Sequence, residues 1–181
     1  ISGIEFSING YGEISKDLDV TVLAGYTYIN PIPVNPNFIY AYDYFEYPVS
    51  YNSSSSDPSV LKYRYQNIAK LDLGINHKKT SFGISARYND FMSNIDSIFT
   101  SILINEGWDE AGIPAFVPGI NESRENTKNG DLIFDIRLGY KMNQNLRIGI
   151  IINNLFNREY MSRPADMRPP RTMAVQCSYK L

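Results

Sequence analysis

Strict alternation of apolar and polar residues is the feature that most constrains this chain. In the segment 131–140 one face is apolar throughout and the other is polar, with Ile133 as the one exception. The alternation recurs in seven segments, at 4–9, 20–28, 69–76, 81–88, 131–140, 148–152 and 172–181. A repeat of two residues is that of a β-strand whose two faces meet different surroundings. The sequence therefore predicts an all-β fold.

The lengths of these strands and of their connections point to a membrane. Several strands run to about 10 residues, longer than the usual strand of about 5–6 and matched to a tilted bilayer crossing of about 9–11. Short turns at 15–17, 77–80 and 142–145 alternate with long connections at about 30–62, 97–130 and 161–170. Short turns on one side and long external loops on the other are typical of outer-membrane barrels. We predict a transmembrane antiparallel β-barrel.

Composition excludes several other classes. The net charge of −2 and the 20% of charged residues provide no basic field for nucleic acid. The longest apolar stretch, 148–152, is far shorter than the ~20 residues of a membrane-spanning helix. A single cysteine, Cys177, excludes an internal disulfide framework.

Strand parity indicates part of a larger barrel. If the short turns are periplasmic, the odd-numbered strands run towards the periplasm and the chain ends there. Bacterial single-chain barrels have an even number of strands and close on themselves. Seven strands cannot be a whole barrel, and with no leader sequence at Ile1 we expect a fragment of an exported protein.

The last fifth of the chain carries a set of short motifs. The run 154–157 reads Asn-Leu-Phe-Asn, Tyr160 follows, and the run 170–172 reads Pro-Arg-Thr. In order and spacing this stretch resembles the C-terminal end of TonB-dependent outer-membrane receptors; the rest of the chain resembles them in strand-and-loop layout. The Pro169-Pro170 pair, where Gly is commoner, is similar to receptors of the Bacteroides group.

The end of the chain departs from the family pattern. The last strand of these receptors usually ends in an aromatic residue that the barrel-insertion machinery recognises, whereas this chain ends in Leu181 with Tyr179 two residues before it. The resemblance implies that Arg171, Tyr179 and Leu181 serve the terminal strand and barrel assembly.

The resemblance also implies the remaining architecture. Residues 1–181 would be the last seven strands of one 22-stranded barrel, whose lumen is filled by an N-terminal plug domain that is not in this chain. The implied partners are the TonB–ExbB–ExbD energy-coupling complex, acting through the missing N-terminal region, the barrel-insertion machinery, the lipid bilayer and, by family analogy, a surface lipoprotein.

The implied activity is TonB-dependent uptake across the outer membrane of a Gram-negative bacterium. Its cargo would be a scarce, bulky ligand such as an iron chelate, haem, cobalamin, an oligosaccharide or a peptide. The alternative is an outer-membrane barrel that binds or adheres without transport, or a porin without a plug.

Candidate ligand contacts lie in the long loops. Tyr40, Tyr42, Tyr44 and Tyr47 combine large ring area with hydroxyl groups, which suits capture of such ligands. The alternation of the first three equally fits a strand-like extension that packs on its neighbours, and we favour that interpretation. Trp108 in the second loop stands beside acidic residues. Their carboxylates could hold calcium, but their spacing matches no calcium-binding loop, so we favour a solvated acidic loop.

Charged residues on the polar faces of the strands fit a polar barrel interior. They are Glu5, Lys70, Asp72, Arg87, Asp135 and Arg137. A soluble β-sandwich could expose the same charges, so strand length and loop asymmetry discriminate better.

The sequence shows no catalytic constellation, metal site or cofactor motif. The one histidine, His77, falls in a predicted periplasmic turn, far from an outer-face active site, and Cys177 is expected to face lipid. We predict that the protein is not an enzyme.

Overall fold

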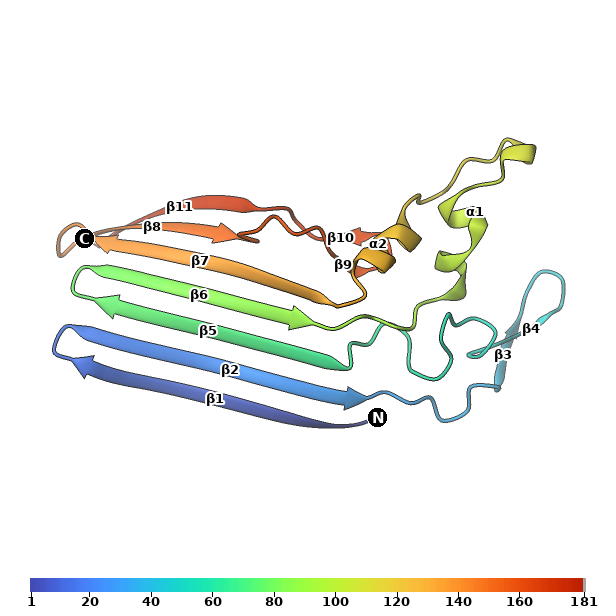
Figure 1. Cartoon of the computed structure of the whole chain (residues 1–181), viewed down its shortest axis with the longest axis horizontal. Coiled ribbons are helices and arrows are strands. Elements are labelled where there is room, and N and C mark those ends of the chain that lie inside the picture. Colours follow the sequence, from blue (N-terminus) through green and yellow to red (C-terminus); the bar gives the residue numbers. More distant parts are fainter. Residues whose placement is uncertain (181) are drawn as a thin grey trace.

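A single large antiparallel sheet dominates the computed structural model, which describes residues 1–180 apart from the side chain of Asp109 (Figure 1). Within this part of the chain the sheet has seven strands, each beside the next in sequence order. They are β1 (Ser2–Ser15), β2 (Leu18–Asn30), β5 (Asn67–His77), β6 (Thr80–Asn89), β7 (Asp131–Lys141), β8 (Leu146–Asn153) and β11 (Thr172–Tyr179). The seven predicted strands are confirmed.

The two ends of the sheet differ as the sequence predicts. The β1–β2, β5–β6 and β7–β8 turns lie together at one end of the sheet, which we call the short-turn end. The long connections lie at the other end, which we call the loop end (Figure 1). The long connections contain elements that the alternation does not predict. These are the hairpin of β3 (Ile39–Tyr42) and β4 (Pro48–Ser50), the helical turns η1 (Ser97–Thr100), α1 (Ile102–Asn105), η2 (Asp109–Ala111) and α2 (Ile120–Asn126), and the hairpin of β9 (Met161–Arg163) and β10 (Asp166–Met167).

The strand register gathers side chains of one kind into rows across the sheet. One row, from β2 to β11, is Val22, Leu73, Ile84, Ile136, Ile152 and Met173. The next row, from β1 to β7, is Asn9, Leu23, Asp72, Ser85 and Asp135. Because adjacent rows point to opposite sides of the sheet, it has an apolar face and a polar face.

Within the described residues no layer covers the apolar face. Among the described residues the buried apolar side chains are Met92, Ile95, Ile120 and Ile133, and none of these belongs to the apolar rows. Phe6 and Val175, which do, are 65% and 78% exposed. In the part of the chain that the structure describes, no helix is long and apolar enough to cross a membrane.

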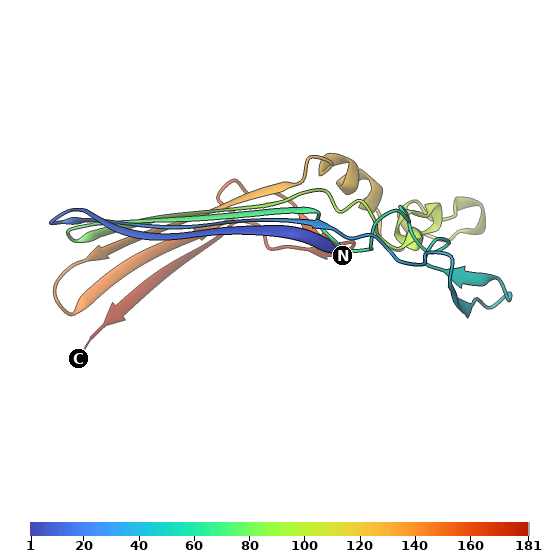
Figure 2. The same cartoon turned by 90° about the horizontal axis from the view of Figure 1, so that it is seen from below.

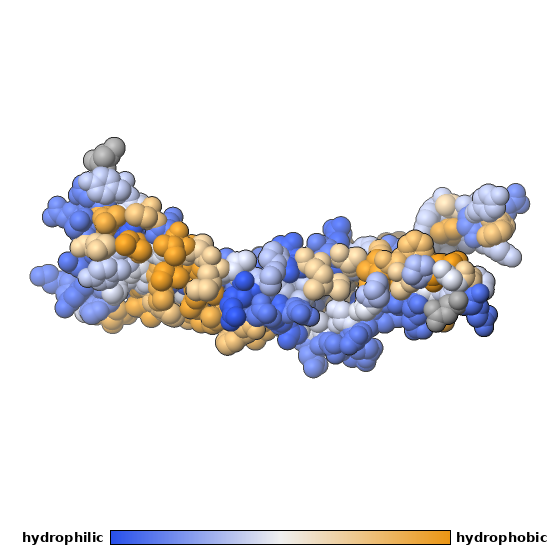
Figure 3. All heavy atoms as spheres, turned by 90° about the horizontal axis from the view of Figure 1, so that it is seen from above, coloured by the Kyte–Doolittle hydropathy of each residue, from blue (hydrophilic) through white to orange (hydrophobic). Residues whose placement is uncertain are grey.

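The sheet is curved and open. Figure 2 shows the last strands bending to one side, with the β3–β4 hairpin at the loop end on that same side. In Figure 3 hydrophobic atoms gather over the strand half of the molecule and again over the loops, with a hydrophilic stretch between them. Within residues 1–180 neither β1 nor β11 has a strand on its outer edge.

Candidate functional site

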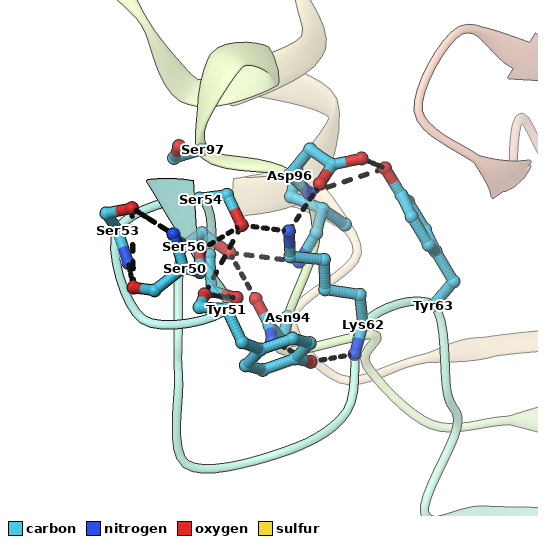
Figure 4. Close-up of polar contacts among 12 residues, drawn as sticks. Ser50, Tyr51, Ser53, Ser54, Ser56, Lys62, Tyr63, Asn94, Asp96 and Ser97 are labelled. Atoms are coloured by element: carbon cyan, nitrogen blue, oxygen red, sulfur yellow. Dashed lines mark hydrogen bonds and ion pairs between the residues drawn. The ribbon is translucent and has the colours of Figure 1, made fainter. Parts of the chain in front are cut away.

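A polar network joins the first long connection to the second at the loop end of the sheet (Figure 4). The Tyr51 hydroxyl donates to the carbonyl oxygen of Val60 at 2.8 Å and accepts from the backbone N–H of Lys62 and from Nδ2 of Asn94, the latter at 2.9 Å. The fully buried Asn94 also donates to Val60 O at 2.6 Å and accepts from the backbone N–H of Asp57 at 3.0 Å. Buried polar groups with all these partners fix the base of the loops in one arrangement.

An ion pair completes this network. Lys62 Nζ donates to Asp96 Oδ1 at 2.5 Å and to Ser54 Oγ at 2.7 Å, and the Tyr63 hydroxyl donates to the other oxygen of Asp96. Burial raises the pKa of Asp96, but the hydrogen bonds from Lys62 and Tyr63 outweigh it and hold that pKa below its usual value. Burial, helped by the bond to Asp96, raises the pKa of Tyr63.

The Ser54–Lys62 contact is structural rather than catalytic. The ammonium of Lys62 is engaged by the carboxylate of Asp96, so it is not a base towards Ser54. The Ser54 hydroxyl donates instead to the carbonyl oxygen of Ser50 at 2.8 Å. This arrangement stiffens the loop and activates no nucleophile.

Above this base the β3–β4 hairpin presents exposed aromatic rings. Tyr40, Tyr42, Tyr44 and Tyr47 are 56%, 67%, 93% and 68% exposed. The Asp43 carboxylate accepts from the backbone N–H groups of Phe45 and Tyr47 at 2.9 and 2.8 Å and so closes the turn. Residues Ile39–Tyr42 form the strand β3, the Tyr40 hydroxyl makes a hydrogen bond of 2.9 Å with Ser54 Oγ, and the other three rings are mostly exposed.

The hairpin is also poor in positive charge. Between 31 and 61 the sequence has no Lys or Arg and three acids, Asp43, Glu46 and Asp57. Rings with free faces and hydroxyl groups can stack on flat ligands and hydrogen bond to their edges. We call residues 38–47 the aromatic hairpin.

The second predicted contact lies elsewhere. Trp108 is 57% exposed and pairs with Ile113 in an isolated bridge near η2. Figure 1 shows the connection that carries α1 apart from the β3–β4 hairpin. Within the described residues no ring contact joins Trp108 to the four tyrosines.

The Asn-Leu-Phe-Asn motif forms a cluster of hydrogen bonds at the loop end of β8, which we call the Asn154 cluster. Buried Asn154, in the left-handed region at φ 51°, donates from its backbone N–H to Asp135 at 2.8 Å. Its side chain donates to the carbonyl oxygens of Arg158 and Pro169 at 2.8 and 3.3 Å and accepts from the N–H of Arg158 at 2.9 Å. Arg158 in turn pairs with Asp131 at 2.9 Å. The Asn154 cluster thus links β7, β8 and the third long connection.

The predicted terminal-strand residues fall on both ends of β11. Arg171 donates from its backbone N–H to Oδ1 of Asn157 at 2.8 Å, which links the two motifs. Tyr179, 63% exposed, pairs with Leu146 at the short-turn end. Leu181 lies outside the described residues.

The predicted charges of the polar face form two ion pairs across strands. Arg137 contacts both oxygens of Asp72 at 2.8 Å, and Arg87 contacts Asp135 at 3.0 Å. Arg137 lies flat across Gly83, where a Cβ would come within 2.9 Å of its guanidinium. Glu5 and Lys70 share this face by register, and neither has an ion pair within the described residues.

Chemistry-bearing side chains remain scattered. Within the described residues no three His, Cys, Asp or Glu side chains lie close enough to hold a metal ion. Cys177 is exposed and pairs with Ile148 in an apolar row, as predicted. His77 ends β5 at the short-turn end.

Comparison with known proteins identifies the fold. No family model and no curated protein matches this sequence. The siderophore receptor PiuA from Acinetobacter baumannii is similar in structure, with a TM-score of 0.62 and 18% sequence identity over 98% of this chain and 21% of that one. The ferric-catecholate import receptor Fiu from E. coli K12, in its open form, aligns with a TM-score of 0.49 and 20% identity over 98% of this chain and 20% of that one.

The likeness to PiuA confirms the predicted fold class. The chain spans about a fifth of the length of the receptors that it matches. Its antiparallel sheet has the fold of a C-terminal portion of a TonB-dependent receptor barrel. The matched proteins are transport receptors rather than enzymes.

Proposed function

We propose that this chain is the C-terminal portion of a TonB-dependent receptor that takes up a scarce, bulky ligand across the outer membrane of a Gram-negative bacterium. The observation that carries the proposal is the uncovered apolar face of a sheet whose other face is polar. In water such a face would be costly, at roughly 25 cal/mol per Å² of exposed apolar surface, whereas lipid covers it.

The rest of the machinery belongs to the whole receptor. We propose that the sheet forms the last seven of 22 strands, around a plug domain contributed by sequence upstream of this chain. Energy would come from the TonB–ExbB–ExbD complex, and the barrel-insertion machinery would assemble the barrel, with Arg171, Tyr179 and Leu181 serving the terminal strand. The similarity of Pro169-Pro170 to Bacteroides-group receptors, and a surface lipoprotein partner, form the finer part of this proposal.

We propose that the long connections lie outside the cell and capture the ligand. The aromatic hairpin supplies Tyr40, Tyr42, Tyr44 and Tyr47 on a rigid base, and Trp108 supplies a separate contact. Iron chelates, haem, cobalamin and oligosaccharides or peptides are the candidate cargo. PiuA is described as a siderophore receptor, which makes iron chelates the first ligands to test here.

Uptake by the full-length protein tests the function. A strain that lacks the gene should lose accumulation of one labelled candidate ligand, and the gene should restore it only in the presence of a functional energy-coupling complex. Migration of the unheated protein in gels should differ from that of the heated protein. Recovery of the full-length protein as a soluble monomer without detergent, or uptake that is independent of energy coupling, would contradict the proposal.

A further inference from the structure

Positive charge collects at the short-turn end of the sheet. Lys16, Lys78, Lys79, Lys141 and Arg147 line one hollow of about 410 Å³, together with Asp17 and Asp19. Three of the cations are in the β1–β2 and β5–β6 turns, and Lys141 and Arg147 are register partners on β7 and β8. By strand parity Lys141 and Arg147 share the polar face with Arg137.

These five cations have no ion pair within residues 1–180, a property that they share with Arg64, Lys70 and Arg168 but not with five other cations. At the loop end Lys62, Lys128 and Arg158 each pair with a carboxylate, and on the polar face Arg87 and Arg137 do the same. None of the five cations around the hollow has an ion pair within residues 1–180, although Asp17 and Asp19 line the same space. Arg147 donates only to the Ser81 hydroxyl, at 2.8 Å. Five cations against two carboxylates leave an excess of positive charge around the hollow, which favours an anionic ligand.

The spacing of the cations favours an extended ligand over a compact one. Neighbouring strands are about 4.8 Å apart, so successive hairpin turns follow at about 10 Å. An extended polypeptide rises about 3.3 Å per residue, so carboxylates on every third residue repeat at the same interval of about 10 Å.

The position of Lys141 and Arg147 argues against lipid as the ligand of this hollow. Lipid would lie on the apolar face, whereas Lys141 and Arg147 are on the opposite face. Lys16, Lys78 and Lys79 are exposed at the end of the strands, where a chain arriving from beyond the sheet can reach them.

We infer that the short-turn end binds an acidic polypeptide segment of a separate protein, which lies across the hairpin turns with its carboxylates on Lys16, Lys78, Lys79 and Lys141. That this protein is periplasmic rests on the proposed function, which sets the orientation of the sheet. Binding itself depends only on the hollow and its charges.

The test uses the purified full-length receptor in detergent and a fluorescent peptide of about 12 residues with Asp at every third position, in about 50 mM salt. The matched probe has Asn in place of Asp. We expect the acidic peptide alone to bind, and the triple variant K78Q/K79Q/K141Q to bind it about tenfold more weakly. A matched variant at the loop end, R64Q/K128Q/R168Q, should bind as the wild type does, and raised salt should weaken binding.

Several results would overturn the inference. Equal binding of the Asn peptide, equal loss in the loop-end variant, or no binding to the wild type would each do so. Full displacement of the peptide by inorganic phosphate at equal charge concentration would show a small-anion site instead. Carbodiimide coupling of Lys78, Lys79 or Lys141 to a carboxylate of the receptor outside Asp17 and Asp19 would show that the receptor fills the hollow itself. Any of these results in a receptor that still takes up its cargo would leave the proposed function standing.

Discussion

The two ends of this sheet join consecutive antiparallel strands in different ways. At the short-turn end a few residues close each hairpin, and cations such as Lys78 and Lys141 have no ion pairs within residues 1–180. At the loop end the connections are fixed by contacts between residues far apart in sequence, such as Tyr51 with Asn94. The short-turn end is therefore locally encoded, whereas the base of the loop end is held by polar contacts between distant residues and presents exposed rings.

Replacing Asn154 should damage the loop end most. N154A removes buried hydrogen bonds to Arg158 and Pro169 and places alanine at φ 51°, so we expect the receptor to lose about 3 kcal/mol of unfolding free energy. Denaturant unfolding of the full-length protein measures this loss. The neighbouring variant N153A, which removes one exposed bond to Thr172, should cost less than about 1 kcal/mol. Similar losses of unfolding free energy in both variants would refute a special role for the Asn154 cluster.

Removing the Tyr51 hydroxyl tests the loop network by itself. Y51F leaves the backbone N–H of Lys62 without its partner, so we expect local opening of residues 51–62 to become easier by about 1–2 kcal/mol. Amide hydrogen exchange measures this change. Y44F, on a side chain that is 93% exposed, should leave exchange unaltered. Unchanged exchange in Y51F would show that the network does not hold the loop.

Ligand capture should depend on rings that contribute nothing to stability. The variant Y42A/Y44A/F45A should weaken ligand binding to the full-length receptor about tenfold or more while the unfolding free energy stays within about 0.5 kcal/mol. Calorimetric titration with the transported ligand measures the affinity. F116A, on an exposed ring of the second connection, serves as the matched control, and an equal loss there would contradict a specific role for the aromatic hairpin.

Acidification should give the smallest effect. The folded-state pKa of Asp96 lies below its ordinary value of 3.8, so its contribution is present above that value and is lost as pH falls through the folded pKa. Because the Asp96 side chain is 40% exposed, we expect less than about 1 kcal/mol. Pepsin cleavage of the loops between about pH 5 and pH 2 should accelerate on acidification in the wild type and change less with pH in D96N. The same pH dependence in both proteins would assign the effect to other groups.

The sequence allowed the strands to be predicted because each one carries its own evidence. Alternation in 131–140 locates β7 and its two faces without any knowledge of its neighbours. Ile133, the one exception to the alternation, lies on the polar face in the row of Lys70 and Arg87. Its side chain is buried there, so the apolar residue is not exposed on that face.

The loop contacts escaped prediction because they are not local. Nothing near Tyr51 in the sequence indicates that Asn94 and Val60 will meet its hydroxyl, and the short helices α1 and α2 lack a long periodic pattern. The motif at 154–157 marks Asn154 in the sequence but does not indicate its physical role. Its position just after an alternating strand, where an αL turn is needed, is a signal that could have suggested that role.

Gly83 and Gly139 have a consequence for passage through a closed barrel. Arg137 and Arg147 lie flat against the backbone because a Cβ at these glycines would come within 2.9 and 3.0 Å of the guanidinium nitrogens. An alanine at either place would lift a long cationic side chain towards the barrel axis by the thickness of a methyl group. If the sheet closes into the barrel proposed above, these two glycines would affect the space along its polar face as much as the charged residues beside them do.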